Sequence, residues 1–281
     1  MTAGHRNYRE KFTQSLVGLV PIISSKKFST MARMKHRNLA VLVASTCIGL
    51  ASFTVGAQSV PVTIMPFGDS ITAFGAAPES SYRYWLWQDL QNAGFTQVTF
   101  VGNQSGVAGG GSPANTDFEQ SYEGGGDDDG IDTGTGLNLA QSDAAGRTPG
   151  IVLLELGAND AFESNVTPGD TETNLEEIIQ ALAAGNASVI VLIATPPRFM
   201  PDPTLSKQEQ NQERTHLARI DSVIGRVVSA EKRAGVNVIK VSLGGYNPRT
   251  DTSDGTHPNV KGEQYIAKQF FTPLKKILAK M

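Results

Sequence analysis

Three short polar stretches carry side chains that could together hydrolyse an ester. Ser70 follows directly on an apolar run that ends "IMPFGDS", residues 64–70. "LGAND" places Asn159 after a second apolar run, and "SDGTHP" places Asp254 three residues before His257. A serine becomes a nucleophile when a histidine takes its proton and an acid orients that histidine, and a carboxamide can donate to the oxyanion that forms. The chain therefore contains the residue types that acyl transfer needs.

Residues 58–281 offer two histidines as the base. His216 lies in "QNQERTHLARID", a charged and helix-like stretch that predicts a solvated surface position. His257 lies in a loop, where Gly255 permits a turn that brings the Asp254 carboxylate onto Nδ1 and leaves Nε2 free. An ordinary turn before a helix explains D-x-x-H equally well, and Asn159 taken alone fits an Asx turn.

Alternating apolar and amphipathic segments predict the elements that must position these residues. Long amphipathic stretches predict helices over 81–94, 170–185, 206–235 and 259–280, the second of them opening with a capping signal. Apolar runs predict strands over 60–67, 97–102, 150–157, 188–195 and 236–243. This alternation, with right-handed crossovers, predicts an α/β fold whose parallel sheet of about five strands lies between two helical layers.

Residues 103–149 are rich in Gly, Ser, Asn and Asp, and we expect them to form one long loop. This loop follows the second predicted strand, Ser70 follows the first and Asn159 the third. In an open α/β sheet the ligand binds beyond the carboxyl ends of the strands. We therefore expect all three segments to meet at one edge of the sheet.

Strand–G-D-S, strand–G-x-N-D and strand–D-x-x-H-P, in this order, resemble the SGNH (GDSL) hydrolase family. The resemblance covers residues 61 to about 278. It implies a flavodoxin-like α/β/α sandwich and ester hydrolysis through an acyl-enzyme, without a metal or an organic cofactor. It further implies that Ser70 is the nucleophile, His257 the general base and Asp254 the acid that orients it. Asn159 and the Ser70 N–H would be donors of the oxyanion hole.

The family's remaining oxyanion donor is a glycine N–H in the loop after the second strand. We assign it to Gly124 in "SYEGGG", with Gly102 in "FVGN" as the alternative. Asp69 and Asp160 stand beside the motif residues, and we expect their carboxylates to tie nearby backbone groups rather than to react.

Further residues resemble the secreted carbohydrate esterases of family 3, which include acetylxylan esterases. "YRYWLW" (82–87), "VTFVGNQSG" (98–106) and "YEG" (122–124) carry this resemblance. The chain departs from that branch at Tyr122, where a histidine is usual, and at Ala158, where a threonine is usual. The substrate implied is an acetylated polysaccharide or oligosaccharide. A lipolytic GDSL esterase or lysophospholipase is the nearer alternative, and a non-catalytic glycan-binding protein is the other.

The aromatic cluster and the acidic glycine-rich stretch suggest a sugar-binding platform and a calcium site, but their residue patterns favour other interpretations. Tyr82, Tyr84, Trp85 and Trp87 could form a sugar platform, but their helical spacing favours core packing, with Arg83 bridging loops near the site. "GGGDDDGIDTG", residues 124–134, lacks the spacing and the terminal Glu of an EF-hand loop. We interpret it as a solvated acidic loop rather than a structural calcium site, and expect no metal.

Residues 1–57 are predicted to be an upstream extension and a secretory signal. The basic stretch 31–37 precedes the apolar stretch 38–57, which ends in small residues suited to cleavage after Ala57. An uncleaved membrane anchor is the alternative. We hypothesise that translation starts at Met31 or Met34, which would leave residues 1–30 outside the protein.

Cleavage would change both charge and cysteine content. Residues 1–57 hold eight of the 24 Lys and Arg residues and one of the 27 Asp and Glu residues, so 58–281 carries a net charge of about −10. The sole cysteine, Cys47, would leave with the signal. We therefore predict one monomeric domain over 58–281, extracellular or periplasmic, with no disulfide and no affinity for nucleic acid or an anionic membrane.

Overall fold

Five short apolar segments pair into one parallel sheet. A computed structural model describes residues 61–73, 81–102, 104–105, 119–120, 133–146, 148–162 and 166–281. The strands are β1 (Val62–Gly68), β2 (Val98–Phe100), β5 (Ile151–Glu155), β6 (Ile190–Ala194) and β7 (Asn237–Val241). Their order is β2-β1-β5-β6-β7, and every neighbouring pair is parallel. This is the flavodoxin-like order, so the predicted fold class is confirmed.

Each predicted helix is present, with small shifts at its ends. The long helices are α2 (Ser81–Asn92), α5 (Pro168–Gly185), α6 (Lys207–Arg233) and α8 (Val260–Leu278). Capping boxes from Thr167 to Asp170 and from Ser206 to Glu209 open α5 and α6. The cap of α5 therefore lies three residues before residue 170, where the capping signal was expected. None of the helices in the described ranges is long and apolar enough to cross a membrane.

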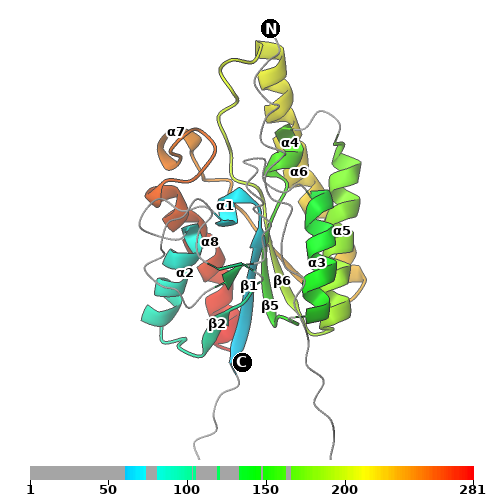
Figure 1. Cartoon of the computed structure of the whole chain (residues 1–281), viewed down its shortest axis with the longest axis vertical. Helices are drawn as coiled ribbons and strands as arrows, with labels where there is room; N and C mark the ends of the chain where they lie inside the picture. The colour runs from blue at the N-terminus through cyan, green and yellow to red at the C-terminus, as the bar shows by residue number, and fades with distance from the viewer. Residues whose placement is uncertain are drawn as a thin grey trace, which may run out of the picture. The chain divides into compact units, whose positions relative to one another are not determined.

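Helices cover both faces of the sheet. Figure 1 shows α2 and α8 on one side and α3 (Thr133–Gly146), α5 and α6 on the other. Successive strand residues point to opposite faces, so Met65 and Val152 pack with α5 and α6 while Ile64 and Leu153 pack with α2 and α8. Burial on both faces explains why these strands read as unbroken apolar runs.

The prediction of a single loop over 103–149 was wrong. α3 occupies Thr133–Gly146 and supplies the crossover that a parallel connection from β2 to β5 requires. The short strands β3 (Gln104–Ser105) and β4 (Glu119–Gln120) pair antiparallel within the same stretch. The sequence of α3, "TGTGLNLAQSDAAG", contains three glycines, which lower helix propensity; packing against α5 overrides it.

β1 and β5 are neighbours at the position where the strand order reverses. β1 pairs with β2 on one side and with β5 on the other, and Gly68 lies opposite Glu155. The chain leaves β1 into the short helix α1 (Ser70–Ala73) and leaves β5 into α4 (Ala158–Phe162). Ligands bind at such a switch point, and the residues after both strands meet there.

Candidate active site

Ser70 is the first residue of α1 and is held by the residue before it. The Asp69 carbonyl accepts from the N–H groups of Thr72 and Ala73, and the Asp69 carboxylate accepts from Ile71 N at 2.9 Å. Asp69 thus caps α1, as predicted. Ser70 is 6% exposed, and its own N–H lies in the first turn, where helical N–H groups have no intrahelical partner.

His257 reaches Ser70 from the loop between α7 (Pro248–Asp251) and α8. Ser253 N donates to the His257 carbonyl at 2.9 Å, and Asn259 Nδ2 donates to the carbonyls of Thr250 and Thr252. Gly255 has φ +98°, which confirms the turn predicted there. These bonds set the position of the imidazole before any substrate arrives.

The three side chains of the predicted triad form a continuous hydrogen-bonded line. His257 Nε2 lies 3.1 Å from Ser70 Oγ, and His257 Nδ1 lies 2.7 Å from Asp254 Oδ2. Asp254 Oδ1 accepts from Thr256 N at 2.9 Å and from His257 N at 2.7 Å. This arrangement favours the tautomer with the proton on Nδ1, so that Nε2 can accept the proton of Ser70.

Solvent exposure increases along the hydrogen-bonded line from Ser70 to Asp254. The side chains of His257 and Asp254 are 34% and 53% exposed, whereas Ser70 is almost fully buried. Partial burial by itself would raise the pKa of Asp254, but hydrogen bonds from His257 and Thr256 outweigh it and hold that pKa below its usual range. Asp254 is therefore an anion at neutral pH.

Asn159 lies at the same edge, on the second residue of α4. Gly157 adopts φ +111°, and a Cβ there would lie 3.1 Å from Ile220, so the turn out of β5 requires glycine. Asn159 Nδ2 lies 3.5 Å from Asp69 Oδ2. The carboxamide therefore contacts the residue that caps the Ser70 helix.

The acids and the arginine beside the motifs have the tying roles that the sequence predicted. Asp160 is buried and accepts from Thr133 N and Thr133 Oγ1, and also from Thr171 Oγ1, which joins α4 to α3 and α5. Arg83 Nε donates to the Thr72 carbonyl at 2.9 Å, linking α2 to α1.

The aromatic cluster packs in the core as predicted, whereas His216, predicted to be a solvated surface residue, is only partly exposed. Tyr82 is fully buried, and Tyr84, Trp85 and Trp87 pack against the core beneath α2 and α8. His216 is a half-buried residue of α6, and none of the hydrogen bonds described joins it to Ser70.

The assignment of the glycine donor stays a prediction. Gly124 lies outside the described residues, as do the acidic stretch up to residue 132 and the predicted signal over 1–57. Gly102 is described, and is buried just beyond the end of β2. No group of three or more His, Cys, Asp or Glu residues in the described part of the chain could hold a metal ion.

The sequence patterns did not identify one buried acidic residue at this edge. Glu155 ends β5 and is fully buried next to Asp69. The glutamate inside the apolar run "GIVLLELG" is the feature of the sequence that could have pointed to this residue. A lone charged residue in a strand buried on both faces needs a partner.

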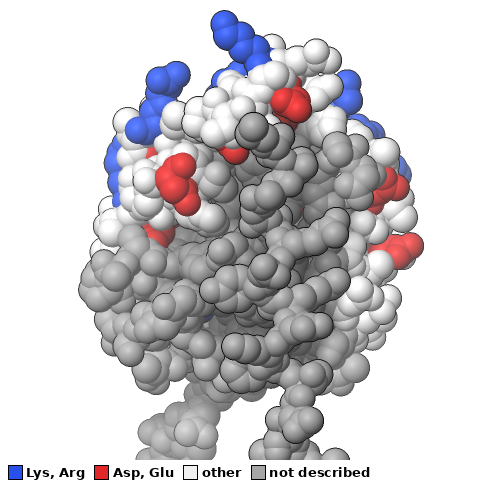
Figure 2. Space-filling model, turned by 45° about the horizontal axis from the view of Figure 1, so that its top comes forward, with Lys and Arg blue, Asp and Glu red and all other residues white. Residues whose placement is uncertain are grey.

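Apolar side chains also reach the surface beside the triad. Phe162 and Met200 are exposed large hydrophobic residues, and the Phe162 ring packs on Phe199 with centroids 4.1 Å apart. Met200 N donates to the Gly255 carbonyl at 2.7 Å, which brings this apolar group against the triad loop. Figure 2 looks onto this end of the domain, and its described surface carries interspersed acidic and basic side chains.

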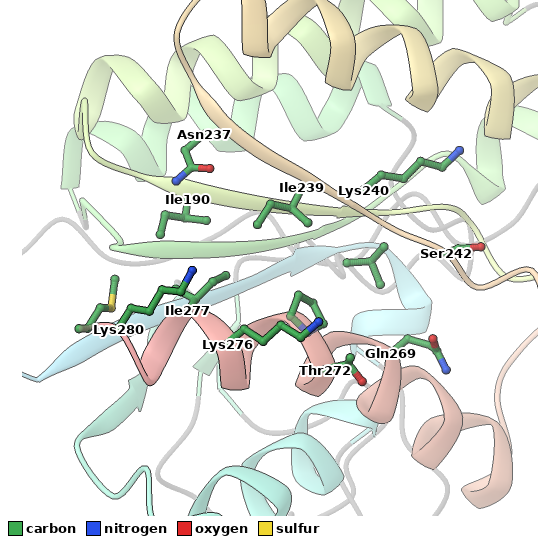
Figure 3. A pocket seen from close by; sticks show the side chains of 13 residues that line it. Ile190, Asn237, Ile239, Lys240, Ser242, Gln269, Thr272, Lys276, Ile277 and Lys280 are labelled. Atoms are coloured by element: carbon green, nitrogen blue, oxygen red, sulfur yellow. The ribbon is translucent and has the colours of Figure 1, made fainter.

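A groove of about 700 Å³ lies away from these residues, between the edge strand β7 and the second half of α8. Its floor includes Ile190, Ile239 and Ile277. Lys276 on α8 and Lys280, just after α8 ends, lie beside it (Figure 3). None of the predicted site residues lines it. The hydrogen-bonded triad, rather than this groove, is therefore the candidate active site.

The chain is similar in sequence to known esterases. The chain is 24% identical to esterase TesA of Pseudomonas aeruginosa over 242 residues, which cover 85% of this chain and all of that protein. It is 28% identical to a multidomain esterase of Ruminococcus flavefaciens over 231 residues, 76% of this chain and 28% of that protein.

Solved structures share the fold. A carbohydrate esterase of family 3 from Talaromyces cellulolyticus matches 78% of this chain and 99% of its own at a TM-score of 0.62 and 21% identity. A family 3 carbohydrate esterase of Clostridium thermocellum matches 78% of this chain and 98% of its own at 0.61 and 24%. The model of the GDSL-like lipase/acylhydrolase family matches residues 67–265, from the end of β1 into α8. The chain therefore belongs to the GDSL-like lipase/acylhydrolase family of esterases.

Proposed function

We propose that this protein is a serine esterase that removes acetyl groups from carbohydrate. The observation that carries the proposal is the continuous line of hydrogen bonds from Asp254 through His257 to Ser70. The similarity to family 3 carbohydrate esterases supports the substrate class. A purely glycan-binding role gives no reason for a complete and hydrogen-bonded triad.

In the proposed reaction His257 Nε2 takes the proton of Ser70 Oγ as that oxygen attacks the acetyl carbonyl. Asn159, the Ser70 N–H and a glycine N–H donate to the oxyanion. The proton then passes from His257 to the departing sugar oxygen, which leaves as an alcohol. Water hydrolyses the acetyl-serine with His257 again as base, and acetate is released.

The direct test is acetate release from acetylated xylan by residues 58–281, with p-nitrophenyl acetate measured beside it. We expect Ser70→Ala and His257→Ala each to lower kcat by several orders of magnitude while the circular dichroism spectrum is retained. The matched control is His216→Ala, which changes a histidine of α6 and should leave kcat unchanged. Wild-type rates in a contaminant-free Ser70→Ala preparation would refute the mechanism.

A lipolytic esterase is the second candidate, and Phe162 and Met200 favour it. Their exposed apolar surface beside the triad loop could hold an acyl chain as well as the apolar face of a sugar. Serine-dependent hydrolysis of p-nitrophenyl octanoate or a lysophospholipid in preference to acetylated xylan would decide for this candidate.

We propose in addition that residues 1–57 direct export and are cleaved after Ala57. The basic and then apolar composition of residues 31–57 supports this. Intact mass and N-terminal sequencing of the protein recovered outside the cytoplasm would test it, and a product retaining residues 38–57 would refute it.

A further inference from the structure

Two carboxyl groups are buried side by side beneath Ser70. Asp69 and Glu155 are each 0% exposed, and the pairing of Gly68 with Glu155 across β1 and β5 brings their side chains together. The two carboxyl groups lie within hydrogen-bonding reach of each other. Two adjacent carboxylates in a buried site cannot both be ionised without a large electrostatic cost, so the contact requires a proton.

The hydrogen-bond donors around the pair show which carboxyl carries that proton. Asp69 accepts from Ile71 N at 2.9 Å and lies 3.5 Å from Asn159 Nδ2, so it is the acceptor. No N–H or O–H of the described residues other than a carboxyl proton reaches either oxygen of Glu155. Glu155 as an anion would thus leave two buried oxygens unsatisfied, whereas a protonated Glu155 can donate to Asp69.

We propose that Glu155 is a positioning residue: it keeps its proton at neutral pH, donates to the Asp69 carboxylate, and so fixes Asn159 and the turn that carries Ser70. Asp69 is the link, because its carboxylate caps α1 and contacts the Asn159 carboxamide. Loss of the proton would place two carboxylates in contact and push Asp69 away from both partners. Whether Glu155 carries a proton does not depend on the proposed function. Only the expected effect on kcat rests on the proposed function.

The surroundings favour the protonated pair. Burial is the largest cause that raises the pKa of both carboxyls. Asp69 raises the pKa of Glu155 further, whereas the hydrogen bond from Glu155 lowers the pKa of Asp69. The ionisable groups that face the pair are Tyr82 on α2, Asp160 on α4, and Tyr246 and His257 after β7. Of these only His257 can bring positive charge, and Asp160 adds negative charge. Arg83 lies nearby, where it bonds the carbonyls of α1.

The first experiment measures the proton without catalysis. In a Ser70→Ala background, the unfolding equilibrium is followed from about pH 5 to about pH 9 with and without Glu155→Gln. A carboxyl whose pKa is raised by folding gives stability at low pH that is lost as the pH rises toward the folded pKa. The unfolding constant of the protein with Glu155 should therefore rise with pH relative to Glu155→Gln, by up to about tenfold per pH unit.

Glu231→Gln is the matched control, since Glu231 is a buried glutamate of α6 that hydrogen-bonds Gln180 at 3.1 Å, away from Ser70. It should not reproduce the pH-dependent difference. Stability curves that stay parallel with and without Glu155→Gln above about pH 5 would show an ordinary ionised glutamate and overturn the proposal.

The second experiment tests positioning, with p-nitrophenyl acetate as the probe. Glu155→Leu should lower kcat by about tenfold to a hundredfold with little change in KM, because Asn159 and Ser70 lose their fixed geometry. In the wild type, loss of the Glu155 proton as the pH rises should lower kcat. Glu155→Gln, whose amide still donates to Asp69, should recover most of the loss seen in Glu155→Leu and should remove that decline at high pH. Wild-type kcat in Glu155→Leu, or the same alkaline profile with and without Glu155→Gln, would overturn the positioning role. A wild-type protein that hydrolyses no ester would refute the proposed function and leave the stability result intact.

Discussion

Replacing Asp254 by asparagine should harm catalysis more than replacing it by alanine. Asp254 Oδ1 accepts two backbone N–H groups, from Thr256 at 2.9 Å and from His257 at 2.7 Å. In Asp254→Asn only the amide oxygen can accept these bonds, so the amide NH₂ must face His257 Nδ1. Nδ1 then becomes an acceptor and the imidazole proton moves to Nε2, which can no longer take the proton of Ser70.

The magnitude follows from the same contacts. Turning the amide round would break two backbone hydrogen bonds, so the wrong tautomer is favoured by about 1–3 kcal/mol. Loss of the carboxylate also removes charge stabilisation of the imidazolium, about 1–2 kcal/mol after allowing for the 53% exposure of the Asp254 side chain. Together these reduce kcat by between about thirtyfold and several thousandfold. Asp254→Ala loses only the charge stabilisation of the imidazolium. A water molecule can accept the Nδ1 proton there, so the tautomer with a free Nε2 is kept.

The assay is kcat on p-nitrophenyl acetate for both variants, with ¹⁵N chemical shifts of His257 recorded in the Ser70→Ala background to identify the tautomer. We expect Asp254→Asn to be the slower variant and to show the proton on Nε2. If Asp254→Ala were slower, or if Asp254→Asn kept kcat within about threefold of wild type, the orientation argument would be refuted.

Three further outcomes are expected. Asn159→Ala should lower kcat by about 10²–10³-fold at similar KM, because an oxyanion donor acts mainly in the transition state; equal effects on KM would point to substrate binding instead. Asp160→Ala should lower the free energy of unfolding by about 2–4 kcal/mol, measured in urea, since it removes the acceptor of three hydrogen bonds from Thr133 and α5. Arg226→Ala should leave the urea midpoint of unfolding almost unchanged, because its ion pair with Glu172 at 2.6 Å is solvent-exposed; a midpoint as low as that of Asp160→Ala would contradict this expectation.

Local pattern in the sequence was enough to predict most of the fold. Apolar runs identified all five strands of the sheet, of which β1, β5 and β6 are buried over most of their length. Amphipathic patterns identified the four long helices, although the cap of α5 lies three residues earlier than the sequence predicted. α3 could not be found in this way, because its glycines and polar residues carry no clear helical period. Its helix is stabilised by packing against α5, which a local pattern does not contain.

The sequence alone determined which residues could act and at which edge of the sheet they would gather, since parallel strands place everything that follows them at one end. Only the tertiary structure decided that His257 Nε2 lies 3.1 Å from Ser70 Oγ across 187 residues of chain. It also decided that Glu155 lies against Asp69, because the register of β1 on β5 sets that contact. Spacing along the chain fixes neighbours such as Asp254 and His257, whereas contacts between strands and loops depend on how the whole sheet is assembled.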